Sequence, residues 1–169
     1  DMNRLIDNRW PGLRRTVIGV TVQGENASNE IVRGLLAAGR LADLNVANRL
    51  DQPPVDLIIV GRGGGAPEDL WAFNLEPVAR AIIASTVPVI SAVGHESDLL
   101  VSDLVADLRA STPSNAVEHG VPEYDYHQML IQQLHERIDD STNRLLQDYR
   151  HNLQFFQSRL LNAPLKGIY

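Results

Sequence analysis

The sequence predicts an α/β fold with an open, mostly parallel sheet, crossover helices and a long helix at the C-terminal end. Three continuous apolar runs, Thr16–Val22, Val55–Val60 and Pro88–Val93, predict buried strands. Strands that are covered on both faces carry unbroken apolar runs rather than alternating ones. Helical patterns at Ser28–Leu41 and Pro67–Ser85 separate these runs. This strand–helix–strand order is typical of parallel strands joined by crossover helices.

Further helices are expected around this framework. The chain starts in a helical pattern, Asp1–Asn8, and a third helical stretch is predicted at Asp98–Leu108. Glu76-Pro77 should divide the second crossover segment, because proline is tolerated only in the first turn of a helix. After a break, Ser114 is expected to cap a short helix that runs to Glu118.

The C-terminal segment has a different pattern. Between Glu123 and Asn162, apolar residues recur at intervals close to a heptad repeat: Leu134, Ile138, Leu145, Tyr149, Phe156 and Leu160. We therefore divide the chain into an α/β catalytic core at 1–120 and a long helical segment at 121–169, the start of a coiled-coil arm. Such a helix would be on the order of 60 Å long. The alternative is a helix that folds back onto the sheet in two halves.

Composition limits the classes of function. The sequence of 169 residues has no cysteine, which excludes disulfides and thiolate catalysis. No apolar run reaches the ~18 residues of a membrane helix, and no signal-peptide pattern opens the chain, so we expect a cytoplasmic protein. The net charge of −6 predicts weak DNA binding by this stretch alone. Because the first residue is Asp1 rather than Met, we expect flanking domains beyond this sequence.

Unusual residues follow each predicted strand. Gln23, Arg62, His95 and Asp98 all come at or shortly after a strand end. In parallel sheets, ligands bind at the carboxyl ends of the strands, so we expect these side chains at one edge. Arg62 is followed by Gly63, Gly64 and Gly65, whose N–H groups could enclose an anion ahead of a helix start. Three glycines could equally serve only a tight turn.

His95 and Asp98 are the candidates for proton transfer. A carboxylate near an imidazole stabilises its charged form and orients the ring. The alternatives are a structural histidine and an aspartate that only caps a helix. Arg109 could point toward substrate phosphates, or it could join Asp103 and Asp107 on an exposed helix face with a local ion pair. No cluster with metal-ligand spacing is present.

Three blocks in this order resemble the large subunit of exodeoxyribonuclease VII. They are GRGGGAPEDLWAFN (Gly61–Asn74), PVISAVGHESD (Pro88–Asp98) and VADLRASTPS (Val105–Ser114), and VQG (Val22–Gly24) fits the same pattern. The resemblance covers roughly residues 1–118. The chain departs from the family pattern at Leu100, where a threonine is usual.

The resemblance implies a nuclease that cleaves single-stranded DNA from either end to oligonucleotides. It implies several copies of a small helical subunit as partners and a separate OB-fold domain for DNA binding. The family's catalytic positions match Asp1, Arg62, His95 and Asp98, with Asp1 matched mainly by spacing. No metal is obligatory in this family, although Mg²⁺ is compatible with it.

Two other functions share parts of this pattern. An α/β enzyme that binds a small phosphorylated metabolite would use the same glycine loop but needs a closed pocket. A non-enzymatic scaffold would use the long helix to recruit partners while the α/β core stays inert. The first alternative predicts binding of a sugar phosphate, and the second predicts that Arg62 and His95 lie far apart.

Overall fold

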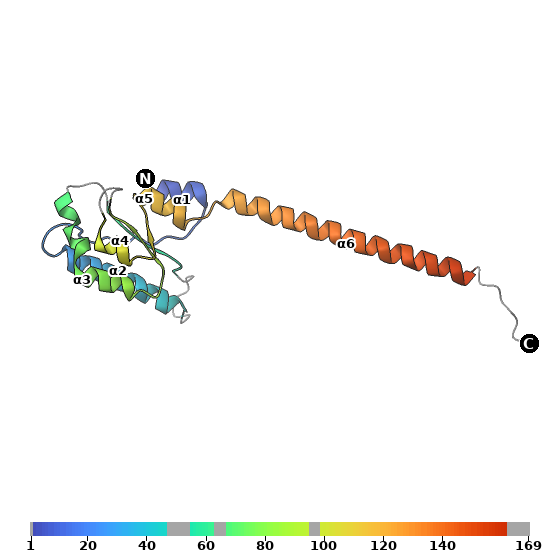
Figure 1. The fold of residues 1–169 in the computed structure, drawn as a ribbon, viewed down its shortest axis with the longest axis horizontal. Helices are drawn as coiled ribbons and strands as arrows, with labels where there is room; N and C mark the ends of the chain where they lie inside the picture. The colour runs from blue at the N-terminus through green and yellow to red at the C-terminus, as the bar shows by residue number, and fades with distance from the viewer. Residues whose placement is uncertain (1, 47–54, 63–66, 95–98, 162–169) are drawn as a thin grey trace, which may run out of the picture. The chain divides into compact units, whose positions relative to one another are not determined.

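The computed structural model describes residues 2–46, 55–62, 67–94 and 99–161. Contacts between residues divide the chain into two units, Asp1–Glu123 and Tyr124–Tyr169. The first unit is an α/β domain and the second consists of a long helix, which confirms the predicted fold class (Figure 1).

The sheet is small, open and parallel. Its strands are β1 (Ile58–Gly61), β2 (Val89–Ala92) and β3 (Leu108–Arg109), in the spatial order β1-β2-β3. Two of the three predicted apolar runs, Val55–Val60 and Pro88–Val93, therefore contain strands. Both pairings are parallel, as the alternation of strands and helices predicted.

The first predicted strand is wrong. Residues 16–22 form no strand, and Val17 is 78% exposed. Val20 and Val22 are partly buried against the main core, so only alternate side chains of this segment are covered. The apolar run predicted that residues 16–22 would be covered on both faces. In the described residues it is covered on one face and joins no ladder.

The predicted helix Asp98–Leu108 is also too long. The helix α4 covers only Val101–Val105, and Ala106 ends it with an extended backbone (φ −71°, ψ 154°). The chain then enters β3, which the sequence did not predict. A strand of two residues has no periodicity that could distinguish it from the end of a helix.

Helices cover both faces of the sheet because neighbouring residues of a strand point to opposite sides. Ile58 of β1 and Val89 of β2 pair in register and belong to one core cluster with the helix α2 (Ala27–Val46) and the helix α3 (Glu76–Ile83). Figure 1 shows α2 and α3 side by side on this face. The 3-10 helix η1 (Pro67–Asn74) precedes α3, and Pro77 lies in the first turn of α3, as predicted.

The other face is covered by the helix α5 (Pro113–Gly120), and α1 (Met2–Arg9) packs beside it. Ile90 of β2 packs with Ala116 of α5, and a smaller cluster joins Ile6, Val117 and Val121. The N-cap of α5 is Thr112 rather than the predicted Ser114, because the Thr112 hydroxyl accepts the N–H of Asn115.

Arg9 links the end of α1 to the end of α5. Its Nε donates to the carbonyl of Val121 at 2.8 Å and its Nη2 to the carbonyl of Glu118 at 3.2 Å. Its Nη1 forms an ion pair with Glu123 at 3.1 Å. The guanidinium therefore serves carbonyl groups at the C-terminal end of α5 that lack partners within that helix.

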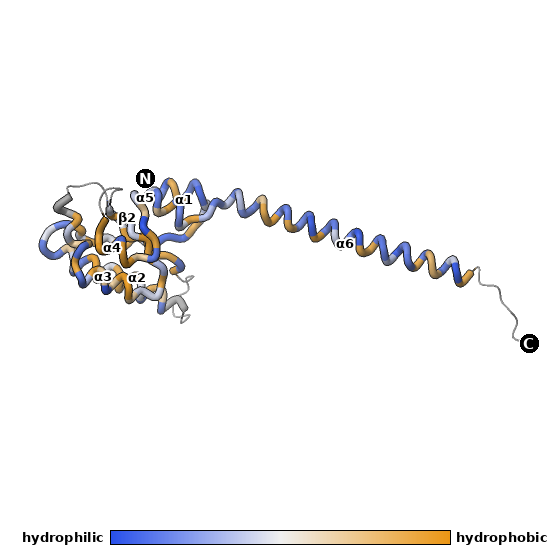
Figure 2. The backbone as a smooth tube through the Cα atoms, viewed as in Figure 1, coloured by the Kyte–Doolittle hydropathy of each residue, from blue (hydrophilic) through white to orange (hydrophobic). Residues whose placement is uncertain are grey.

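The second unit contains the helix α6 (Tyr124–Leu161), which is 38 residues long and has no buried residue. It is continuous, so the alternative of two halves folding back is wrong. Figure 2 shows hydrophobic and hydrophilic residues recurring along its whole length. The predicted stripe is present and exposed: Leu134, Ile138, Leu145, Tyr149, Phe156 and Leu160. Among the described residues, no helix is long and apolar enough to cross a membrane.

Candidate active site

The register of β1 and β2 places the ends of both strands at one edge of the sheet. Gly61, the last residue of β1, pairs with Ala92, the last residue of β2. Arg62 follows Gly61 directly, and Gly94 lies two residues beyond Ala92. Because the strands are parallel, the chain leaves both of them at the same edge. Arg62 and Gly94 therefore both follow their strands at this shared edge.

Six of the predicted site residues lie outside the described residues: Asp1, Gly63, Gly64, Gly65, His95 and Asp98. Their convergence around a phosphate stays a prediction. Three others are described, namely Gln23, Arg62 and Arg109.

Each of these three has a different setting. Arg62 is half-buried immediately after β1. Gln23 is exposed in the turn before α2, next to Gly24, whose φ of +86° requires a residue without a side chain. Since Gln23 follows no strand, no register aligns it with the other candidates. Arg109 lies on β3 opposite Ser91 of β2.

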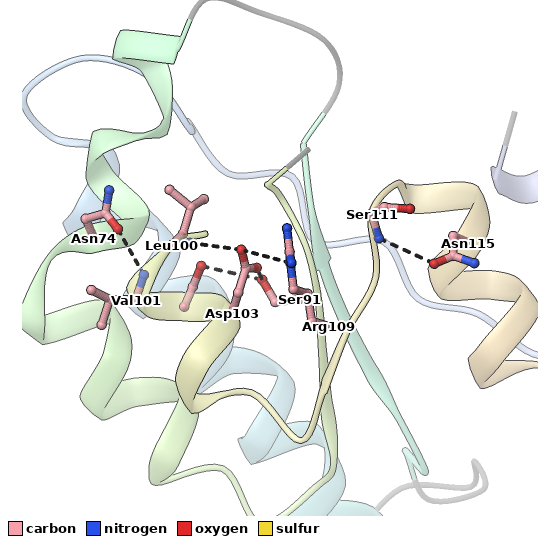
Figure 3. A network of polar contacts seen from close by, with 9 residues as sticks. Asn74, Ser91, Leu100, Val101, Asp103, Arg109, Ser111 and Asn115 are labelled. Atoms are coloured by element: carbon pink, nitrogen blue, oxygen red, sulfur yellow. Dashed lines mark hydrogen bonds and ion pairs between the residues drawn. The ribbon is translucent and has the colours of Figure 1, made fainter. Parts of the chain in front are cut away.

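A buried polar network joins β2, α4 and β3 below this edge (Figure 3). Asp103 Oδ1 accepts the Ser91 hydroxyl at 2.6 Å, and its Oδ2 accepts the N–H of Leu100 at 3.1 Å. Arg109 Nε lies 3.7 Å from the same Oδ2. The Asp103 side chain is 0% exposed and that of Arg109 is 33% exposed. The predicted exposed helix face is therefore wrong for Asp103, while its ion pair with Arg109 is present.

Asn74 was missed by the sequence reasoning. It is the last residue of η1, and its Oδ1 accepts the N–H of Val101 at 2.9 Å, across 27 residues of sequence (Figure 3). An asparagine at the end of a helical segment usually suggests only a local turn. The available signal was position: Asn74 ends the glycine-loop block, and Val101 follows the His95–Asp98 block.

The aromatic residues after the glycine loop have opposite environments. Phe73 is fully buried in the main core. Trp71 is 68% exposed and therefore lies outside the core. An exposed indole offers a flat surface on which a base can stack.

Among the described residues, no group of three or more His, Asp or Glu side chains could hold a metal ion. The described range leaves out Asp1, His95 and Asp98. Arg62, which follows the end of β1, carries a guanidinium group, and guanidinium groups bind anions rather than cations.

Comparison with known proteins identifies the family. The model described as "Exonuclease VII, large subunit" matches residues 1–168. The chain belongs to this family. A relative from Hahella chejuensis, named exodeoxyribonuclease 7 large subunit, is 44% identical over 162 residues, which are 95% of this chain and 34% of the relative. Relatives with the same name from Desulforudis audaxviator and Alkaliphilus oremlandii are 46% and 43% identical, over 95% and 100% of this chain.

Those matches cover 35% and 39% of the two relatives. The chain thus spans little more than a third of the length of these family members. The resemblance seen in the glycine-loop and His95 blocks is confirmed at the level of the family.

Proposed function

We propose that this chain carries the catalytic core of an exonuclease that hydrolyses the phosphodiester bonds of single-stranded DNA to oligonucleotides. The observation that supports the proposal is the register of β1 and β2, which ends both strands at the same edge, with Arg62 following one strand and Gly94 following the other. Membership of the exonuclease VII large-subunit family supports the substrate class, since the relatives are named exodeoxyribonucleases.

Each of these groups has a role in the proposed hydrolysis. The Arg62 guanidinium and the N–H groups of Gly63–Gly65 bind the phosphate and stabilise the charge that develops on its oxygens. His95 is the general acid–base, or the nucleophile, because imidazole titrates near neutrality and can take a proton from water and return one to the leaving oxygen. Asp98 orients His95, and Asp1 positions the attacking water or the imidazole.

Binding and assembly involve further groups. Gln23 and Arg109 contact the DNA backbone, and much of the affinity comes from domains outside this sequence, because this stretch has a net charge of −6. The partners are single-stranded DNA and several copies of the exonuclease VII small subunit, in the cytoplasm. No metal is obligatory, so EDTA should leave activity in place, and a complete loss of activity in EDTA would contradict this part.

The test replaces Arg62 and His95 by alanine in the full-length large subunit, assembled with the small subunit. Release of oligonucleotides from labelled single-stranded DNA should fall by roughly 100-fold or more for each variant, which is the range for losing one electrostatic or acid–base group. Arg80→Ala and His119→Ala are matched controls on exposed positions of α3 and α5 and should keep wild-type rates.

Near-wild-type rates in both Arg62→Ala and His95→Ala would end the assignment. Two rivals then remain. Saturable binding of a sugar phosphate, competed by phosphate but not by oligonucleotides, would favour a small-metabolite enzyme. A wild-type assembly that cleaves no DNA but still binds the small subunit would favour a scaffold.

A further inference from the structure

The helix α4 is too short to be stable without contacts to other elements. It has five residues, and isolated helices of this length are unstable in water because the first turn is costly to form. Its N-cap residue is Leu100, whose side chain has no oxygen and therefore cannot cap the helix. The N–H groups of the first turn must find acceptors elsewhere.

Two side chains accept neighbouring N–H groups of this turn. Asp103 accepts the N–H of Leu100 at 3.1 Å from within the helix, which is one half of a capping box. Asn74 accepts the N–H of Val101 at 2.9 Å from the end of η1. Asp103 is itself held by the Ser91 hydroxyl of β2, so α4 is attached both to the sheet and to η1.

The Asn74 contact connects the end of the glycine-loop block to the helix that follows the His95 block. η1 starts at Pro67, directly after the stretch that contains Arg62 and the three glycines. α4 starts at Val101, three residues after Asp98. One hydrogen bond therefore connects the chain downstream of the phosphate-binding group to the chain downstream of the proton-transfer groups.

We propose that Asn74 is a positioning residue for phosphodiester hydrolysis, which holds the start of α4 against the end of η1 through its bond to Val101. The proposal rests on the function proposed above. Loss of the Asn74 bond should affect the alignment of the reacting groups and not the affinity for DNA. Asn74 accepts a hydrogen bond from a backbone N–H and is not among the residues predicted to bind DNA. A misplacement of reacting groups by ~1 Å can lower a rate on the order of 100-fold.

The experiment compares Asn74→Ala with Asn74→Asp in the full-length large subunit assembled with the small subunit, with kcat and KM measured on single-stranded DNA. Asn74→Ala removes the acceptor, and kcat should fall by about 10-fold to 100-fold while KM stays within about twofold. Asn74→Asp keeps an oxygen acceptor at the N-terminal end of α4, where negative charge is favourable, and should retain kcat within about threefold.

Asp107→Ala is the matched control. Asp107 Oδ2 accepts the N–H of Val89 at 2.8 Å, so it is also a side chain that accepts a backbone N–H, but it lies at the amino end of β2, away from the candidate edge. Its removal should lower Tm about as much as Asn74→Ala does, while kcat stays at the wild-type value.

A wild-type kcat in folded Asn74→Ala, or an equal fall of kcat in Asn74→Asp and Asn74→Ala, overturns the proposal. A fall of kcat in Asp107→Ala as large as in Asn74→Ala also overturns it, because general destabilisation would then explain both. If Asn74→Ala does not fold, Asn74→Ser replaces it, since a shorter side chain no longer reaches Val101, and the same outcomes apply. Inactive wild-type protein, or active Arg62→Ala and His95→Ala variants, refutes the proposed function instead.

Discussion

The two units of this chain use apolar residues in opposite ways. In the α/β unit, residues such as Phe73, Val78 and Val89 are fully buried between the sheet and its helices. In α6, none of the 38 residues is buried, although apolar residues recur along its length. A core stabilises the first unit within a single chain. The apolar stripe of α6 contributes no burial free energy unless another surface covers it. Such an exposed stripe is expected of a helix that binds a partner.

The largest difference between the units should appear when a core side chain is removed. Phe73→Ala deletes a ring that is 0% exposed in the main core, and it should lower the free energy of unfolding by about 3–5 kcal/mol. Urea unfolding monitored by tryptophan fluorescence would measure this, since Trp10 and Trp71 both lie in the α/β unit. A cost below about 1 kcal/mol would contradict the assignment of this ring to the core.

A smaller effect is expected in the buried polar network. Ser91→Ala removes the hydroxyl that donates to Asp103 at 2.6 Å, and the carboxylate then lacks one of its donors in a site without water contact. The expected cost is about 1–3 kcal/mol, measured by the same unfolding transition. If Ser91→Ala were as stable as wild type, the bond between β2 and α4 would not contribute to folding.

The smallest effect should come from α6. Ile138 is 63% exposed, so Ile138→Ser should change the unfolding of the α/β unit by no more than about 0.5 kcal/mol. Under the proposed assembly with the small subunit, the same change should weaken association, which analytical ultracentrifugation would detect. Destabilisation of the α/β unit in the single chain would mean that α6 supports that unit, and the contrast between the two units would fail.

The sequence predicted those elements that have either length or a clear periodicity. The runs around Ile58 and Val89 are buried on both faces, so their continuous apolar pattern matched parallel strands. The same pattern failed at residues 16–22, because burial there depends on what lies beside the segment and not on its composition. β3 was missed because Leu108–Arg109 is too short to show a period.

The candidate site was predictable only in part. Arg62 could be placed because it follows a strand whose neighbour ends at the same level. Asn74 and Asp103 could not, since their roles come from hydrogen bonds to backbone groups and to Ser91, and neither composition nor periodicity identifies the partners of such long-range bonds. Charge patterning placed Asp103 on a solvated face, whereas burial beside Ser91 decided its environment.

The three contacts of Arg9 have a practical consequence for the shortest fragment of this chain that should fold independently. Deleting α1 would leave the carbonyls of Glu118 and Val121 without their cation and would uncover the apolar face on which Ile6 rests. Truncations meant to isolate the α/β unit should therefore retain everything from Met2 onward and stop after Glu123. A version starting at Thr16 would be a ready target for proteases at the end of α5.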